Sequence, residues 1–307
     1  MAQYVVGVDG GGSKTHVIVA TQRGKELASV TGDASAVTPG GAIASAEVIA
    51  DLVREALTQA EITERPQQLV AGVAGTGREK EQKALLRALR NQSLAEEVDV
   101  VPDAEVALAD AFGPEGAGIL LIAGTGSVAF GRGPTGTLRR CGGWGPVAGD
   151  EGSGAWIGRR ALSVVTSSAD EREPESRLTG ALMTALELES IDDIIPWAAK
   201  ATPKDLAALA THVTTLAADR DLRANSICTV AAEELVLHVR TLARQLFVDE
   251  RAAVPVALAG GMLARGGFLR RLVEHRLKSA VPGAALHAED VVPARGAVKL
   301  ATAALKA

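Results

Sequence analysis

The chain has 307 residues, of which 47% are hydrophobic and 22% charged, and its formal net charge is −5 at pH 7. This composition excludes a disordered chain, and the negative charge argues against a nucleic-acid-binding protein, which usually carries a basic face. Two cysteines, Cys141 and Cys228, are too few for a disulfide framework or a four-cysteine metal site. We find no signal-peptide pattern and no apolar run long enough to span a membrane, so we expect a cytoplasmic protein.

The first third of the chain alternates short apolar segments with helical patterns. The apolar segments predict strands at residues 5–9, 16–20, 26–30, 69–73 and 98–101. Apolar residues that recur every three to four positions predict helices at 39–60, 79–90 and 104–112.

The same order of elements then begins again. Further strands are predicted at 118–123, 128–131, 137–140, 254–259 and 284–288. Helices dominate 153–250, and the clearest of the later helical patterns are at 224–249, 264–279 and 294–306.

This repetition indicates an internal duplication of fold. We expect an α/β protein with two domains, 1–114 and 115–307, divided near the glycine-rich segment 112–118. Each domain should be a mixed five-stranded sheet with helices on both faces. The last helix, 294–306, could pack back on the first domain.

A glycine-rich turn joins the first two strands of each half. The first turn contains Gly10, Gly11, Gly12, Ser13, Lys14 and Thr15, and the second contains Gly124, Thr125, Gly126 and Ser127. Glycine lets backbone N–H groups face an oxyanion without obstruction by side chains. Either one could be a plain tight turn, but two in equivalent positions indicate a polyphosphate held by both. The first turn leads into a strand and lacks the Gly-Lys-Ser/Thr order, so it is neither a P-loop nor a dinucleotide fingerprint.

Two acids and a glycine pair follow predicted strands. Asp103 is placed to bind ligand or accept a proton, although it could equally begin the next helix as its cap. Asp9 could hold Mg²⁺ directly or through water. Gly260 and Gly261 would let a flat ring approach the backbone, or would simply form a bend.

The segment from Cys141 to Gly154 is rich in glycine and contains one tryptophan and two adjacent acids. An exposed indole beside carboxylates can serve as a platform for a sugar ring. The alternative is that Trp144 closes the base of the loop as a packing residue.

Together, these segments resemble the BadF/BadG/BcrA/BcrD ATPase family, and within it the N-acetylglucosamine kinases. The segments are Asp9-Gly-Gly-Gly-Ser-Lys-Thr, Gly124-Thr-Gly-Ser, Cys141-Gly-Gly-Trp-Gly, Gly149-Asp-Glu-Gly-Ser and Gly260-Gly261. The resemblance implies duplicated actin-like ATPase (ribonuclease H-like) domains around an ATP cleft. It implies ATP and Mg²⁺ as cofactors, transfer of the γ-phosphate to the 6-hydroxyl of an amino sugar, a homodimer, and no nucleic-acid or membrane partner.

The resemblance also implies roles for individual residues. Asp103 would be the catalytic base and Asp9 the magnesium-associated carboxylate, acting through water. The turns Gly10–Thr15 and Gly124–Ser127 would bind phosphate, and Gly260 and Gly261 would flank adenosine. The sugar would be contacted by Gly143, Trp144, Asp150 and, in the loop after the third strand, Ser35.

One position departs from the family pattern. Many of these kinases place an Asn in that loop, where this chain has Ala36. This departure leaves the exact acceptor open: glucosamine, N-acetylglucosamine or another hexosamine could fit. The resemblance favours N-acetylglucosamine, with glucosamine as the alternative. An ATPase that activates a dehydratase, a sugar-responsive regulator and an actin-like assembly protein are the remaining alternatives.

Overall fold

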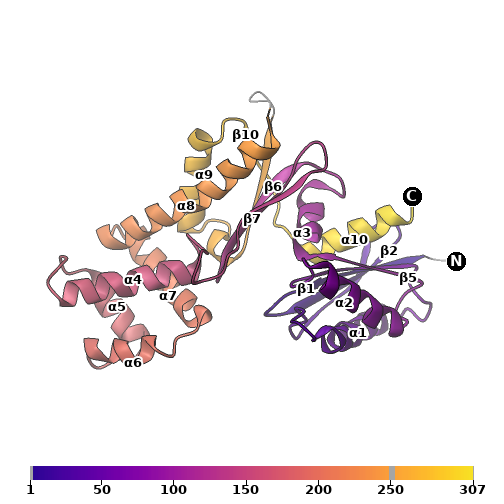
Figure 1. The fold of residues 1–307 in the computed structure, drawn as a ribbon, viewed down its shortest axis with the longest axis horizontal. Helices are drawn as coiled ribbons and strands as arrows, with labels where there is room; N and C mark the ends of the chain where they lie inside the picture. The colour runs from indigo at the N-terminus through magenta and orange to yellow at the C-terminus, as the bar shows by residue number, and fades with distance from the viewer. Residues whose placement is uncertain (1–2, 249–252, 307) are drawn as a thin grey trace. The chain divides into compact units, whose positions relative to one another are not determined.

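The structure, a computed structural model, describes residues 3–248 and 253–306 (Figure 1). The chain separates into two compact units. The first comprises the residues up to Gly116 together with the segment from Glu289 onwards, and the second runs from Ala117 to Ala288. No helix in the described part of the chain combines the length and apolar character needed to cross a membrane.

A mixed five-stranded sheet forms the centre of the first unit. Its strands are β1 (Tyr4–Gly10), β2 (Thr15–Thr21), β3 (Glu26–Gly32), β4 (Gln68–Val73) and β5 (Glu97–Pro102). Their order is β3-β2-β1-β4-β5; β1 is antiparallel to β2 and parallel to β4, which is parallel to β5. The carboxyl ends of β1, β4 and β5 therefore meet at one edge of the sheet, and Asp9 lies opposite Gly72 there.

Helices cover both faces of this sheet, as buried parallel strands require. They are α1 (Ala42–Gln59), α2 (Glu79–Asn91), α3 (Asp103–Phe112) and α10 (Pro293–Ala304). Val6 and Val8 of β1 pack in a cluster with α1 and α2, whereas Val5 and Ile18 pack in a cluster with α3 and α10. The alternation of side chains along β1 thus supplies both cores.

The C-terminal helix α10 belongs to the first unit, although the sequence-based division gave residues 115–307 to the second domain. The cause is a set of contacts centred on Asp110 of α3. Its buried carboxylate accepts hydrogen bonds from the Val292 N–H (2.7 Å) and the Arg295 guanidinium (2.6 and 2.7 Å), and the Lys299 ammonium lies 3.0 Å away. A buried carboxylate is tolerated only when it is paired in this way, so these contacts hold α10 against α3.

The second unit repeats the strand order of the first. Its strands are β6 (Gly118–Ala123), β7 (Ser127–Arg132), β8 (Leu138–Gly142), β9 (Val254–Ala259) and β10 (Ala284–Leu286). The sheet order is β10-β9-β6-β7-β8, and β6 is antiparallel to β7 and parallel to β9, as β1 is to β2 and β4. The predicted duplication of a mixed five-stranded sheet is confirmed.

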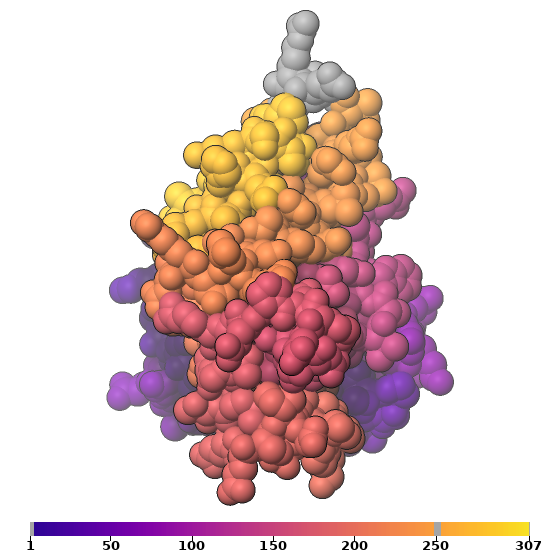
Figure 2. Space-filling model, turned by 90° about the vertical axis from the view of Figure 1, so that its left-hand side faces the viewer, coloured from indigo at the N-terminus to yellow at the C-terminus, as the bar shows by residue number. Residues whose placement is uncertain are grey.

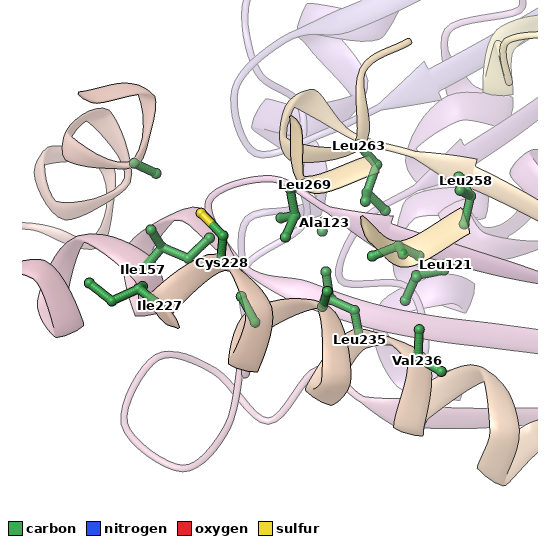
Figure 3. Packing of buried hydrophobic residues seen from close by; sticks show 14 of the residues in the cluster. Leu121, Ala123, Ile157, Ile227, Cys228, Leu235, Val236, Leu258, Leu263 and Leu269 are labelled. Carbon is green, nitrogen blue, oxygen red and sulfur yellow. The ribbon is translucent and has the colours of Figure 1, made fainter. Parts of the chain in front are cut away.

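Helices inserted between β8 and β9 make up much of the second unit. They are α4 (Gly154–Ala169), α5 (Arg177–Ala185), α6 (Ile194–Ala198), α7 (Pro203–Ala218) and α8 (Leu222–Leu246), and α9 (Phe268–Ala280) follows β9. Figure 3 shows Leu121 and Ala123 of β6 in one cluster with Ile157 of α4, Leu235 of α8 and Leu269 of α9. The atoms of α4 to α7, rose to salmon in Figure 2, form the middle and lower part of the face that the figure presents, and orange atoms of later segments lie above them.

Two helices have boundaries that differ from the expected ones or extend beyond the described residues. We expected a helix from residue 264, but α9 begins at Phe268 because Gly266, with a φ of 72°, interrupts the backbone before it. The helix expected at 224–249 is α8, and residue 249 lies outside the described residues.

Candidate active site

The first glycine turn joins β1 to β2 and leaves part of its backbone accessible. Gly10 pairs with Thr15 at the end of the hairpin, and the Gly11 N–H donates to the Lys14 carbonyl at 2.9 Å. Gly12 is exposed, and a methyl group added to it would meet no atom within 4 Å. The packing of the chain does not explain glycine at this position, whereas the approach of an anion to the backbone would.

The loop after β3 braces this turn. The Thr15 hydroxyl lies 2.6 Å from the Asp33 carbonyl and 2.7 Å from the Ser35 hydroxyl, and the Ser35 N–H donates to the Gly11 carbonyl at 3.2 Å. We expected Ser35 to contact the sugar, but its side chain is only 2% exposed and is engaged with Thr15. The structure therefore gives Ser35 a supporting position, while Ser13 and Lys14 are exposed at the tip of the turn.

Asp9 stands at the end of β1, close to a second acid. Burial, together with the nearby negative charge of Asp103, raises the pKa of Asp9 to about 6, against the opposing influence of the Lys14 ammonium. The ends of β1 and β5 thus bring two carboxylates near enough to repel each other. Paired acids with shifted pKa values are typical of functional sites.

Asp103 is the first residue of α3 and is exposed. Its carboxylate accepts a hydrogen bond from the Ala104 N–H at 3.0 Å, so the side chain also stabilises the start of the helix. Partial desolvation nevertheless raises the pKa of Asp103 above its ordinary value, because it outweighs the stabilising backbone hydrogen bonds. The ligand and helix-start interpretations are therefore compatible at this residue.

These acids fit a magnesium ion that binds together with a nucleotide. Mg²⁺ is usually held by one or two carboxylates plus phosphate oxygens and water. Asp9 can supply such a carboxylate, and a cation beside it would offset the repulsion that the charge of Asp103 exerts on it. Within residues 3–248 and 253–306 no group of three or more His, Cys, Asp or Glu side chains could hold a metal ion, so phosphate oxygens would have to complete the coordination.

The second glycine turn joins β6 to β7 and, unlike the first, contacts the start of a helix. The carbonyls of Gly124 and Thr125 accept hydrogen bonds from the Gly154 N–H (2.8 Å) and the Ala155 N–H (3.2 Å) at the start of α4. A methyl group added to Gly124 would meet nothing within 4 Å. The turn thus caps a helix with its carbonyls, and Gly124, like Gly12, has open space at its α-carbon.

Ser127, the last residue of this turn, ties the long glycine-rich loop to it. Its hydroxyl donates to the Glu151 carbonyl at 2.7 Å, and its own carbonyl accepts from the Gly143 N–H at 3.0 Å. Ser127 is almost fully buried. Both ends of the loop that carries Trp144 are therefore fixed to the second turn.

Trp144 projects from this loop instead of closing its base. The side chain is 69% exposed, and the Arg140 guanidinium lies over the indole ring at 4.7 Å from its centroid. The neighbouring Gly143 and Gly145 have φ values of 70° and 85°, a conformation that favours glycine. The packing alternative for Trp144 is therefore not supported, and an exposed indole remains available for a ligand.

Asp150 lies beside the second turn in an unusual backbone conformation. Its φ is 58°, which is uncommon for a residue other than glycine, and it is only 9% exposed. A methyl group added to Gly126 would lie 2.7 Å from its carboxylate. Backbone strain of this kind is found at functional sites, where surrounding structure maintains it.

Gly260 and Gly261 at the end of β9 have different environments. Gly260 has a φ of 91°, and a methyl group added there would collide with the Ala123 carbonyl, so its bend is structural. Gly261 has nothing within 4 Å of that position. Of the pair predicted to flank adenosine, only Gly261 lacks a packing explanation.

A third glycine-containing turn, Gly75-Thr76-Gly77, was given no role from the sequence. In the structure this turn follows β4, where the Ala74 N–H donates to the Gly10 carbonyl at 2.8 Å. The buried Thr76 hydroxyl donates to the Val73 carbonyl at 2.6 Å. The sequence signal for a turn beside the first glycine turn was a Gly-x-Gly sequence after the strand that pairs with β1.

Known proteins are similar to this chain over most of its length. The model of the BadF/BadG/BcrA/BcrD ATPase family matches residues 6–301. An N-acetylmuramic acid/N-acetylglucosamine kinase of Clostridium acetobutylicum is 33% identical over 270 residues, which cover 87% of this chain and 88% of that protein. An N-acetyl-D-glucosamine kinase of Dictyostelium discoideum is 30% identical over 313 residues, with 97% and 98% covered.

Among solved structures, a putative N-acetylglucosamine kinase from Chromobacterium violaceum is similar with a TM-score of 0.78 and 28% identity. The similarity covers 97% of this chain and 98% of that one. The family match extends over nearly the whole chain, and both curated relatives are matched over most of their length. The chain belongs to the BadF/BadG/BcrA/BcrD ATPase family.

Proposed function

We propose that this protein is an ATP-dependent kinase that phosphorylates the 6-hydroxyl of an amino sugar, with N-acetylglucosamine as the first candidate. The relatives named N-acetylglucosamine kinase support the reaction class. The observation that carries the proposal is the placement of Asp103 next to Asp9, at the edge of the sheet where the first glycine turn begins.

The two turns are proposed to bind the triphosphate through backbone N–H groups. Open space at Gly12 and Gly124 supports this role, since the fold does not explain glycine at either position. Gly261 would lie along adenosine for the same reason. Mg²⁺ would be associated with Asp9 and the phosphates, where it would neutralise phosphate charge.

Trp144, Gly143 and Asp150 are proposed to contact the sugar. The exposed indole offers an apolar face to the ring, and the Asp150 carboxylate can accept hydrogen bonds from hydroxyl groups. Because Ala36 provides no amide side chain, recognition of the 2-substituent would depend on other residues. Glucosamine therefore remains the alternative acceptor.

Asp103 is the proposed general base. Phosphoryl transfer depends chiefly on positioning and charge stabilisation, and a carboxylate near the acceptor hydroxyl can orient it and take its proton. The raised pKa of Asp103 makes its carboxylate a better proton acceptor than an ordinary aspartate. As the sugar oxygen forms its bond to the γ-phosphorus, the bond from that phosphorus to the β–γ bridging oxygen breaks and ADP leaves. The proton of the sugar hydroxyl passes to the Asp103 carboxylate.

The cysteines do not favour the dehydratase-activator alternative. Partial burial raises the pKa of the Cys141 thiol, and burial raises that of Cys228 to about 12. Ligation of iron in a cluster needs a thiolate, which neither environment favours.

A coupled ADP-release assay over a panel of free hexoses and hexosamines tests the proposal. We expect ADP release that depends on N-acetylglucosamine or glucosamine, with a phosphomonoester at carbon 6 in the product by phosphorus NMR. Sugar-independent ATP hydrolysis, or no turnover with any hexosamine, would contradict it.

A further inference from the structure

A buried histidine lies beneath the loop that carries Trp144 and Asp150. His238 of α8 has a side chain that is only 9% exposed, and its Nε2 lies 4.0 Å from Oε2 of Glu151. Its Nδ1 is buried and has no hydrogen-bond partner within the described part of the chain. The carboxylate that lies beside His238 therefore belongs to the loop.

The loop rests on one stripe of α8. A methyl group added to Gly142 would lie 2.5 Å from Nε2 of His238, and one added to Gly152 would lie 2.5 Å from the Ala231 carbonyl and 2.6 Å from Leu235. Ala231, Leu235 and His238 follow one another at the spacing of a single helix face. The two glycines thus allow the loop to approach α8 closely, and His238 is the polar member of an otherwise apolar stripe.

Stability does not explain a histidine at this position. The unpartnered Nδ1 loses its hydrogen bonds to water on folding, and an aliphatic side chain would suit the stripe without that cost. What the imidazole can do, and an aliphatic side chain cannot, is interact with Glu151. The separation of 4.0 Å is that of a loose ion pair or a water-bridged contact.

Glu151 connects this contact to residues assigned to the ligands. It directly follows Asp150, and its carbonyl accepts the Ser127 hydroxyl of the second glycine turn. A shift of Glu151 would therefore move the Asp150 carboxylate, which lies against Gly126.

We propose that His238 is a positioning residue for the sugar: through Glu151 it fixes the turn that presents Asp150. The inference rests on the proposed function, since it assumes that Asp150 contacts the sugar. His238 itself touches neither the sugar nor the nucleotide.

Kinetics of His238→Leu, with His275→Leu on α9 as the control, test the proposal. His275 is an exposed histidine of the same unit. We expect His238→Leu to raise the hexosamine KM roughly tenfold or more, since small displacements of binding groups have effects of this size. The KM for ATP and the melting temperature should stay close to those of the wild type. His238→Gln, which retains an N–H donor, should restore most of the loss.

A second variant guards against a folding defect. Glu151→Ala should raise the hexosamine KM by a similar factor, and the double variant His238→Leu/Glu151→Ala should be little worse than either single variant. An unchanged hexosamine KM in His238→Leu, fully additive effects in the double variant, or a lower melting temperature without rescue by His238→Gln would overturn the proposal.

Hydrogen exchange of the ligand-free full chain separates this inference from the proposed function. Faster exchange at residues 142–152 in His238→Leu would support the positioning role even if no hexosamine were phosphorylated, in which case the proposed function alone would fail. Unchanged exchange in an enzyme that phosphorylates hexosamine would leave the proposed function intact and overturn the inference.

Discussion

The two units repeat one order of strands but place different chemistry at the strand ends. In the first unit Asp9 lies near the end of β1 and Asp103 follows β5, and the charge of Asp103 raises the pKa of Asp9. In the second unit β10 is followed by His287, and the notable feature is the glycine-rich loop that holds Trp144 and Asp150. Duplication therefore supplies two backbone turns, whereas the acids and the indole are particular to one unit each. Under the proposed function, this division assigns proton transfer to the first unit and sugar recognition to the second.

The largest expected effect concerns the acid of the first unit. Asp103→Asn should lower kcat by about 10²–10⁴-fold, because it removes the general base while retaining the shape of the side chain. Steady-state ADP release measures this change. Glu97 is an exposed acid at the start of β5, the strand that precedes Asp103. Glu97→Gln is the control and should have wild-type kcat. Wild-type turnover in Asp103→Asn would contradict the assignment of Asp103 as the general base, and with it the difference in chemistry between the two units.

The first unit also holds the last helix through Asp110. Asp110→Ala should reduce the free energy of unfolding by about 1–3 kcal/mol, because the Val292 N–H and the Arg295 guanidinium lose their charged acceptor. Asp51→Ala, which breaks the exposed pair with Arg54, should cost less than about 1 kcal/mol. Urea denaturation at pH 7 compares the two, and equal effects would contradict the account.

The stabilisation that Asp110 provides through its contact with Arg295 should depend on pH. Burial alone would raise the pKa of Asp110, but the Arg295 guanidinium, the Val292 N–H and the Lys299 ammonium lower it below the ordinary value. The stabilisation is therefore complete above about pH 4 and is lost as the pH falls through the lower pKa of the folded state. The difference in stability between wild type and Asp110→Ala should shrink over that range, and a difference independent of pH would refute the assignment.

A smaller and opposite effect is expected at Asp9. Its pKa of about 6 means that ionisation costs more in the folded than in the unfolded chain, a cost absent below about pH 4 and complete above about pH 6. Asp9→Asn should therefore stabilise the ligand-free protein at pH 7 by roughly 1–2 kcal/mol, allowing for solvent screening, and much less at pH 4. Thermal melts at the two pH values measure this. Destabilisation at both would show that Asp9 is structural.

The two glycine turns can be compared directly by adding one methyl group to each. The methyl group of Gly12→Ala meets no atom of the chain, so the fold should tolerate it. Because it would obstruct the approach of the triphosphate to the backbone, we expect the KM for ATP to rise about tenfold and the hexosamine KM to stay unchanged. Gly126→Ala places its methyl 2.7 Å from the Asp150 carboxylate, so both KM values should rise. Gly72→Ala, which clashes with Val106 in the core, should instead lower stability by about 1–3 kcal/mol.

The smallest effect concerns the indole of the second unit. Trp144→Ala should raise the hexosamine KM by about 3- to 10-fold, corresponding to the loss of one stacking contact. Because the side chain is exposed, the melting temperature should be nearly unchanged. Competition with unlabelled ATP should show unaltered nucleotide affinity, and an unchanged hexosamine KM would return Trp144 to a surface role.

The succession of strands along the chain and the positions of the paired glycine turns could be predicted because they depend on local patterns. Apolar runs that end in glycine mark β1 and β6, and helical periodicity marks α1 and α8. The position of α10 could not be derived in the same way. It depends on the contact of Asp110 with Arg295, and the periodicity of either helix does not reveal which partner its residues will meet.

Within the site, sequence patterns indicated residue types but not which glycines are constrained by packing. Gly260 and Gly261 are adjacent in the sequence, yet only Gly260 faces a backbone carbonyl. Similarly, Ser35 lies in the expected loop but is bonded to Thr15, a contact between residues that are distant in sequence. The interaction of His238 with Glu151 joins a helix to a loop, and a histidine within an apolar helical stripe was its only sequence signal.

A crystal structure of the protein with a non-hydrolysable ATP analogue and N-acetylglucosamine tests the central claim most directly. We predict phosphate oxygens at the backbone N–H groups of both glycine turns, the sugar ring against Trp144, and its 6-hydroxyl within hydrogen-bonding distance of the Asp103 carboxylate. Nucleotide bound away from both turns, or a sugar whose 6-hydroxyl points away from Asp103, would contradict the account.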